Sequence, residues 1–131
     1  MTDKPIPPQH PEAAAPTTLD AAALAKLRAL DPDGQHDVVG RVLRAFETSL
    51  TRMLAQLAAE LDEGDPVRVS RIAHTLKSSA ASVGALSLAR LCAEIERRHR
   101  GGAASAVRPD VEQLLVEGHS ALAAVGAMLR A

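Results

Sequence analysis

The chain has 131 residues, of which 47% are hydrophobic and 1% aromatic, and its formal net charge at pH 7 is −1. A net charge near zero excludes a strong electrostatic attraction to nucleic acid or to an anionic membrane surface. The single cysteine, Cys92, excludes an internal disulfide framework. Strand-forming β-branched and aromatic residues are scarce, and no apolar run approaches the roughly 20 residues of a membrane span. We therefore expect a soluble, cytoplasmic, mostly helical protein.

The N-terminal segment differs in composition from the rest of the chain. Residues 1–17 hold five of the eight prolines among small and polar residues. We expect this segment to be a disordered N-terminal arm, although a linker left from a larger protein would have the same composition. Residues 18–131 are then expected to form one domain.

Five helical segments follow in chain order. Apolar residues recur at i, i+3, i+4 and i+7 in the second of them, which predicts a helix with one buried face. The Gly64-Asp65-Pro66 corner supplies a helix-ending glycine, a capping aspartate and a proline suited to a first helical position. The expected ranges are about 20–30, 37–61, 66–83 and 85–100, with a last helix that begins near 109. Four long amphipathic helices with short connections predict an all-α, antiparallel four-helix bundle, monomeric, with a short additional N-terminal helix as a cap.

One residue of the third helix stands apart from its apolar stripe. At ~100° per residue, His74 lies roughly 150° from the centre of that stripe and faces solvent. Its neighbours at the helical spacings i−4, i+4 and i+7 are Ser70, Ser78 and Ala81, and Lys77 stands at i+3. A surface histidine without a function is the plain interpretation. Small side chains around an exposed imidazole, with one cation beside it, also leave room for a second macromolecule to approach.

The segment around this histidine resembles a known family. His74-Thr75-Leu76-Lys77-Ser78-Ser79, with Gly84 ten residues after the histidine and a further match as far as Glu96, resembles the histidine-containing phosphotransfer (HPt) domain of bacterial phosphorelays. The resemblance implies that His74 is the phosphoacceptor and Lys77 the cation beside the phosphoryl group. Ser78 stands where many members have glycine. Glu96 and Arg100 stand where the family places polar residues near the histidine, and some members have glutamine at the position of Glu96.

The resemblance implies a phosphocarrier that relays a phosphoryl group, through a phosphohistidine at His74, between receiver-domain aspartates. The partners would be receiver domains of a hybrid histidine kinase and of a response regulator, docking on Ser70, Lys77, Ser78 and Ala81. We expect no cofactor and no metal site in this chain, since the Mg²⁺ and the aspartate would come from the receiver. No glycine-rich nucleotide loop is present, so we expect no autokinase activity and no enzyme in the usual sense. We also expect no general base beside His74.

Two other functions fit the helical pattern less well. An adaptor that binds a receiver or kinase without being phosphorylated would not need Lys77 beside a projecting histidine. A hydrolase or metalloenzyme within the bundle would need inward Glu-x-x-His pairs on two helices, and the sequence has this spacing only once, at Glu96 and His99. Two roles of Arg100 are possible. Its side chain could lie near the phosphoryl group, or its charge could complement the dipole at a helix C-terminus.

The remaining reactive side chains are expected to be structural. His99 and His119 lie on or near apolar stripes, so we expect both to be packed in the interior. Cys92 lies on the inward stripe of its helix and is expected to be an inert core residue. Nucleic-acid binding is not expected, because no aromatic residue is available to stack on bases near the short basic run at 97–100.

Overall fold

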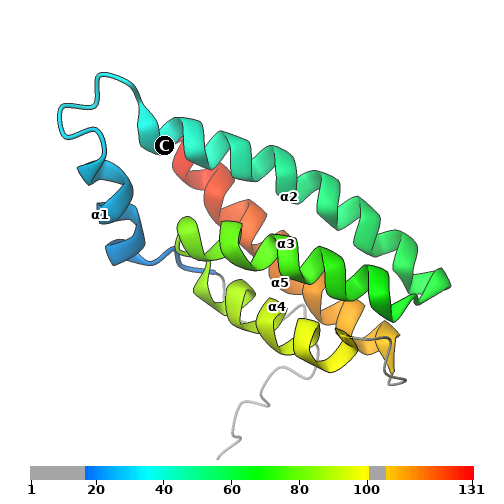
Figure 1. The fold of residues 1–131 in the computed structure, drawn as a ribbon. Helices are drawn as coiled ribbons and strands as arrows, with labels where there is room; N and C mark the ends of the chain where they lie inside the picture. The colour runs from blue at the N-terminus through cyan, green and yellow to red at the C-terminus, as the bar shows by residue number, and fades with distance from the viewer. Residues whose placement is uncertain (1–16, 101–105) are drawn as a thin grey trace, which may run out of the picture.

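The computed structural model describes residues 17–100 and 106–131, and these ranges contain five α-helices and no strand. The helices are α1 (Ala21–Ala29), α2 (Val38–Glu63), α3 (Pro66–Ser82), α4 (Leu86–His99) and α5 (Val107–Leu129). The four long helices run alternately up and down, with α3 beside α4 and α2 beside α5 (Figure 1). The predicted all-α bundle with a short extra N-terminal helix is confirmed. The predicted disordered arm lies outside the described residues, apart from residue 17.

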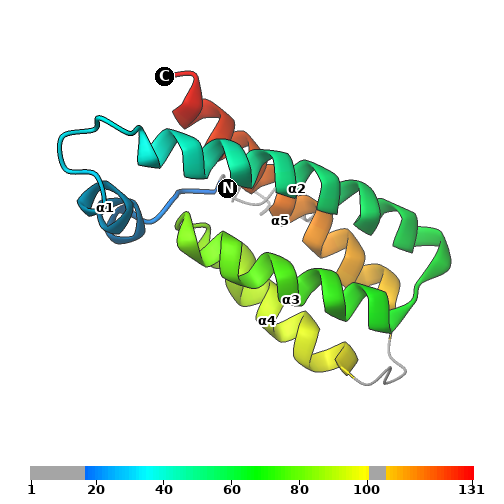
Figure 2. The ribbon, with the colours of Figure 1, turned by 45° about the horizontal axis from the view of Figure 1, so that its top comes forward.

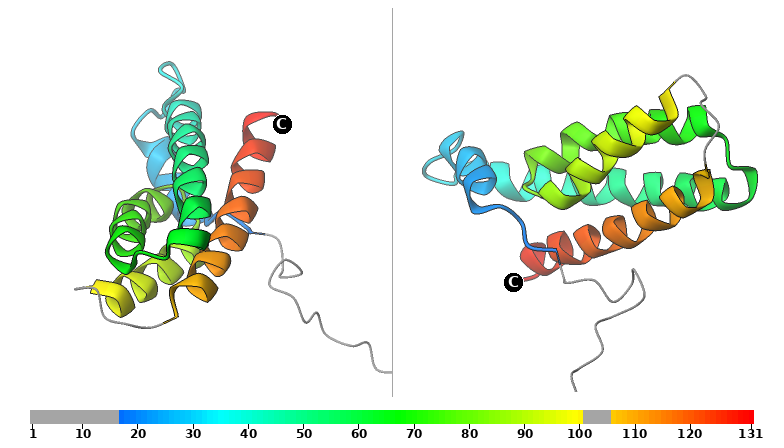
Figure 3. Two further views of the ribbon diagram at one scale, coloured as in Figure 1. Left: turned by 90° about the vertical axis from the view of Figure 1, so that its right-hand side faces the viewer. Right: turned by 90° about the horizontal axis from the view of Figure 1, so that it is seen from below.

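Apolar side chains from all four long helices meet along the axis of the bundle. Two further views of the ribbon show the four long helices packed around this axis (Figure 3). The largest side chains with almost no exposed surface include Leu50, Leu57, Leu76, Leu88 and Leu114. Burying each such side chain stabilises the fold by about 1.5–3 kcal/mol, so this core is the main force that holds the helices together. None of the helices in the described ranges is both long and apolar enough to cross a membrane.

The corner between α2 and α3 is built as its sequence predicts. Gly64 ends α2 in the left-handed region, with φ at 61°, and its N–H donates to the Glu60 carbonyl. The Asp65 carboxylate accepts from the N–H groups of Val67 and Arg68, which have no partner inside the helix. This tight corner sets the antiparallel register of α3 against α2.

The boundaries of two helices differ from the prediction. Helix α5 begins at Val107 rather than near Pro109, because a proline in the first turn removes an N–H that has no partner inside the helix anyway. Helix α4 ends at His99, and Arg100 is its C-cap with an extended backbone (φ −61°, ψ 132°). The backbone at Arg100 therefore turns away from the helical path, and Arg100 is not part of α4.

Helix α1 lies across the end of the bundle where the chain turns from α3 to α4 (Figure 2). The Asp20 N–H donates to the Gly84 carbonyl at 2.8 Å, while the Asp20 carboxylate caps α1 by accepting from Ala23 N–H. Gly84 has φ at 83°, and a Cβ atom there would lie 2.6 Å from the Asp20 nitrogen. Glycine at position 84 therefore allows both the turn and the close approach of the N-terminal segment.

Candidate functional site

His74 projects from the outer face of α3, and 67% of its side-chain surface is exposed. The opposite face of the same helix buries Val69, Ala73, Leu76 and Ala80 in the core. The helical periodicity that separates these two faces is the one that the sequence predicts. The histidine is therefore held on a rigid element with its ring available to a second molecule.

A buried carboxylate on the neighbouring helix lies beneath His74. Glu96 extends from α4 and keeps only 9% of its side chain exposed. Its Oε2 atom lies 2.6 Å from Nδ1 of His74, and its Oε1 atom accepts from Nζ of Lys77 at 2.6 Å. The close packing of α3 against α4 places this carboxylate beneath the imidazole, in direct contact with Nδ1 of His74.

The contacts of Glu96 keep it ionised. The hydrogen bond from Lys77 is the main cause that lowers the pKa of Glu96, and the contact with His74 adds to it. Burial acts in the opposite direction, since it disfavours the charged form. An ionised carboxylate that already accepts from two cationic or N–H groups is a good electrostatic partner for an imidazole and a poor base for activating water.

This contact also selects the form of the histidine ring. An ionised carboxylate has only acceptor atoms, so Nδ1 of His74 is the nitrogen that carries a hydrogen. In the neutral ring the other nitrogen, Nε2, then has a free lone pair. The site thus prepares one defined nucleophilic atom on an exposed ring.

The other predicted site residues divide into two groups. Lys77 and Arg100 join His74 around Glu96, with the Arg100 guanidinium 3.7 Å from Oε2 of Glu96. Arg100 is both close to the site and at the C-terminus of α4, so a role near His74 and a role in complementing the helix dipole are compatible. Ser78 and Ala81 are exposed on the same side of α3 as His74.

Ser70, which the sequence predicts to be an exposed docking residue, packs against α4 instead. Its side chain is half-buried, and its hydroxyl donates to the Glu96 carbonyl at 3.3 Å. Ser70 therefore ties α3 to the end of α4 that carries Glu96. Sequence spacing places Ser70 beside His74, but the contact with α4 depends on how the two helices are rotated against each other.

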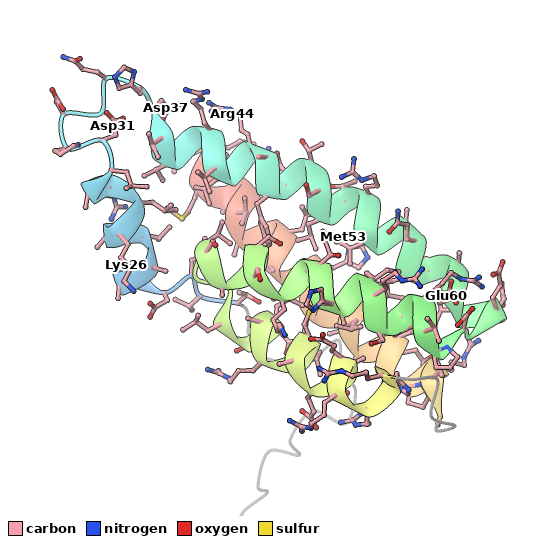
Figure 4. All side chains as sticks on the ribbon, viewed as in Figure 1. Lys26, Asp31, Asp37, Arg44, Met53 and Glu60 are labelled. Atoms are coloured by element: carbon pink, nitrogen blue, oxygen red, sulfur yellow. The ribbon has the colours of Figure 1, made fainter. Side chains whose placement is uncertain are left out.

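A groove that the sequence does not predict runs between α2 and α3. It has a volume of about 600 Å³ and an apolar floor that includes Phe46, Met53 and Ile72. Met53 lies on the side of α2 that faces α3 (Figure 4). Arg71 and Thr75, which lie three residues before and one residue after His74, line the α3 wall. The amphipathic pattern of each helix predicts a buried face, but the gap between two helices follows only from their packing.

The two histidines expected in the interior behave differently. His99 is fully buried, and its Nε2 atom lies 2.6 Å from Asp110, which also accepts from Arg98. His119 is exposed and lines a shallow hollow between α2 and α5. The expectation for His119 is wrong, because α5 turns the neighbouring Gly118 toward Leu50 and Leu54 of α2 instead.

Cys92 is buried in the core, as its place in the apolar stripe predicts. Burial is the main cause that raises the pKa of its thiol to about 12, and the nearby Glu96 carboxylate acts in the same direction. The thiol is therefore protonated at neutral pH and inert. Cys92 belongs to the packing between the helices and not to the chemistry at His74.

Comparison with known proteins decides the family. The model of the Hpt domain matches residues 41–128. The chain belongs to the Hpt domain family. The match covers most of α2 and all of α3 and α4, and the resemblance inferred from the segment that follows His74 is confirmed. Helix α1 precedes the matched segment.

A solved structure supports the same conclusion. The crystal structure of histidine-containing phosphotransfer protein B (HptB) from Pseudomonas aeruginosa PAO1 is similar to this Hpt domain with a TM-score of 0.71 and 26% sequence identity. The similarity covers 86% of this chain and 94% of the HptB chain. No curated protein matches this chain in sequence.

Proposed function

We propose that this Hpt protein carries phosphoryl groups between receiver domains of a multistep phosphorelay, with His74 as the phosphoacceptor. The observation that carries the proposal is the exposed His74 ring with Nδ1 held 2.6 Å from the buried Glu96 carboxylate. Histidine phosphotransfer in phosphorelays is the function of the Hpt family. The carrier step between two receivers is our inference for this chain.

In the proposed step, Nε2 of His74 attacks the phosphorus atom of a receiver's aspartyl phosphate. A nitrogen–phosphorus bond forms while the bond between phosphorus and the aspartate oxygen breaks, and the aspartate leaves as a carboxylate. The phosphorylated ring keeps its hydrogen on Nδ1 and carries a positive charge. Glu96 stabilises that charge, which develops as the ring is phosphorylated. The reverse reaction transfers the phosphoryl group to the aspartate of a second receiver.

Lys77 supplies positive charge on the solvent side of the same site. Its ammonium group forms an ion pair with Glu96 in the unphosphorylated protein, and 36% of its side chain is exposed. A flexible lysine can turn from Glu96 toward the phosphoryl oxygens as their charge builds up. Arg100, whose side chain is 72% exposed, lies close enough to take the vacated place beside Glu96.

Two expectations from the sequence belong to this proposal. Members of the Hpt family are phosphocarriers rather than enzymes in the usual sense, and we propose that this chain has no autokinase activity. We also propose that the Mg²⁺ ion needed for transfer is bound by the receiver together with its aspartate. A monomeric state, a cytoplasmic location and the absence of nucleic-acid binding stay predictions.

Transfer from a radiolabelled receiver tests the proposal. The wild-type chain is expected to take up an acid-labile, base-stable label, and His74→Gln is expected to take up none, because an amide nitrogen is not a usable nucleophile. His36→Gln is the matched control, since His36 is also exposed but lies in the loop before α2. A His74→Gln protein that is still labelled on histidine would contradict the assignment. An adaptor would bind the receiver but leave the wild-type chain unlabelled.

A further inference from the structure

The groove between α2 and α3 lies directly beside the phosphoacceptor. Arg71 and Thr75 line it, and they stand three residues before and one residue after His74 on the same helix. Side chains three or four residues apart on a helix surface are separated by only about 5–6 Å between Cβ atoms. A partner that places an aspartate at His74 therefore covers the adjacent wall of the groove as well.

The shape of the groove fits a helix. The apolar part of its α2 wall runs from Val42 through Phe46 to Met53, which corresponds to about 16 Å at 1.5 Å per residue. Ile72 on α3 and Val83, the C-cap residue of that helix, continue the apolar floor. An apolar floor of this length between two antiparallel helices is suited to the apolar face of an amphipathic helix about three turns long.

The charge of the groove has one sign. Arg52 on α2 and Arg71 on α3 are its only charged lining residues, and no aspartate or glutamate lines it. Both arginines are exposed, and neither forms an ion pair with a carboxylate in the described part of the chain. In contrast, the Glu96 carboxylate beside His74 is already paired with Lys77. The groove therefore presents two unpaired cations from opposite walls.

We propose that Arg52 and Arg71 determine which receivers this protein serves, by selecting a docking helix that carries acidic side chains on both sides of its apolar face. The inference rests on the proposed function and adds a charge requirement to the partner. Rim charges of this kind act mainly on the association rate and give it a salt dependence. A receiver with a neutral or basic docking helix is expected to exchange phosphoryl groups slowly even though His74 is intact.

A charge-reversal variant tests this selection. Arg52→Glu/Arg71→Glu is expected to slow transfer from a receiver that serves the wild-type chain by about 10–100-fold and to reverse the salt dependence of the rate, because salt would then screen a repulsion. The same variant is expected to gain activity with receivers whose docking helix is basic. Arg28→Glu/Arg90→Glu is the matched control, because it makes the same change in net charge at two exposed arginines outside the groove. Arg52→Gln/Arg71→Gln provides a milder second variant, with a smaller loss expected.

Phosphoramidate separates this inference from the proposed function. This small donor phosphorylates imidazole with loss of ammonia and needs no docking surface, so the groove variant is expected to be labelled at the wild-type rate. Wild-type transfer in both groove variants with every receiver would overturn the charge selection. An equal loss in the Arg28/Arg90 control, or an equal loss with phosphoramidate, would overturn it too. Failure of phosphoramidate to label wild-type His74 would instead count against the proposed function, and receiver binding by calorimetry would still test the arginines.

Discussion

Glu96 Oε2 lies 2.6 Å from Nδ1 of His74, although the two residues are 22 positions apart and belong to different helices. The same carboxylate holds Lys77 through its other oxygen. One buried acidic group thus orients both the nucleophile and the cation of the site.

Replacement of Glu96 is expected to slow phosphoryl transfer without removing it. Glu96→Gln retains an oxygen that accepts from Nδ1 of His74 but loses the negative charge, so we expect a decrease of about 10-fold in the single-turnover rate. Glu96→Ala also removes the acceptor, and a larger decrease is expected. Glu94→Gln is the control, because Glu94 is an exposed residue of α4 that pairs with Arg98 instead. An unchanged rate in Glu96→Ala would show that the contact has no part in transfer.

The lowered pKa of Glu96 predicts a specific change in acid stability. As the pH falls below the usual range of a glutamate, the carboxyl of the unfolded chain takes up a proton while the folded one stays ionised. The unfolded state then binds more protons, so the free energy of unfolding decreases with falling pH. The Glu96→Gln variant lacks this contribution, and its stability is expected to fall less between about pH 7 and about pH 3.5. Urea unfolding of both proteins at the two pH values measures the difference, and parallel losses would contradict the prediction.

Lys77→Ala is expected to slow transfer by about 10–100-fold, which corresponds to about 1.4–2.8 kcal/mol of transition-state stabilisation. The reason is that the lysine is the cation best placed to meet the phosphoryl oxygens. Lys26→Ala is the control, since Lys26 is an exposed lysine on α1. Lys77→Arg keeps the charge and is expected to retain more activity than Lys77→Ala. Equal rates in the alanine and arginine variants would show that charge at this position does not matter.

Much of the fold is predictable because its signals are local. The Gly64-Asp65-Pro66 corner, the exposed position of His74 and the burial of Cys92 follow from turn chemistry and helical periodicity. The contact between Glu96 and His74 is not local, because it depends on the rotation of α4 against α3. The exposure of His119 has the same origin, since small residues elsewhere on α5 decide which face meets α2.

Gly84→Ala is expected to destabilise the fold by roughly 1–3 kcal/mol. The new Cβ would require a left-handed backbone at φ 83° and would also meet the Asp20 nitrogen at 2.6 Å. Gly34→Ala is a matched control, because Gly34 has φ at 69° but nothing lies within 4 Å of its added Cβ. The difference between the two variants in denaturant unfolding therefore measures the clash with the N-terminal segment. Equal losses in both would show that the contact at Asp20 is unimportant.

Ser78→Arg is expected to block receiver docking while it leaves the fold intact. Ser78 is exposed one helical turn after His74, so a long charged side chain there would obstruct a partner that approaches the ring. We expect a stability change within about 0.5 kcal/mol, as is usual for surface substitutions. Thr48→Arg is the control, since it adds the same side chain to an exposed position on the α5 side of α2. Phosphoramidate is expected to label both variants, whereas a phosphorylated receiver is expected to label only Thr48→Arg. Unchanged receiver affinity in Ser78→Arg would place the docking surface away from this side of α3.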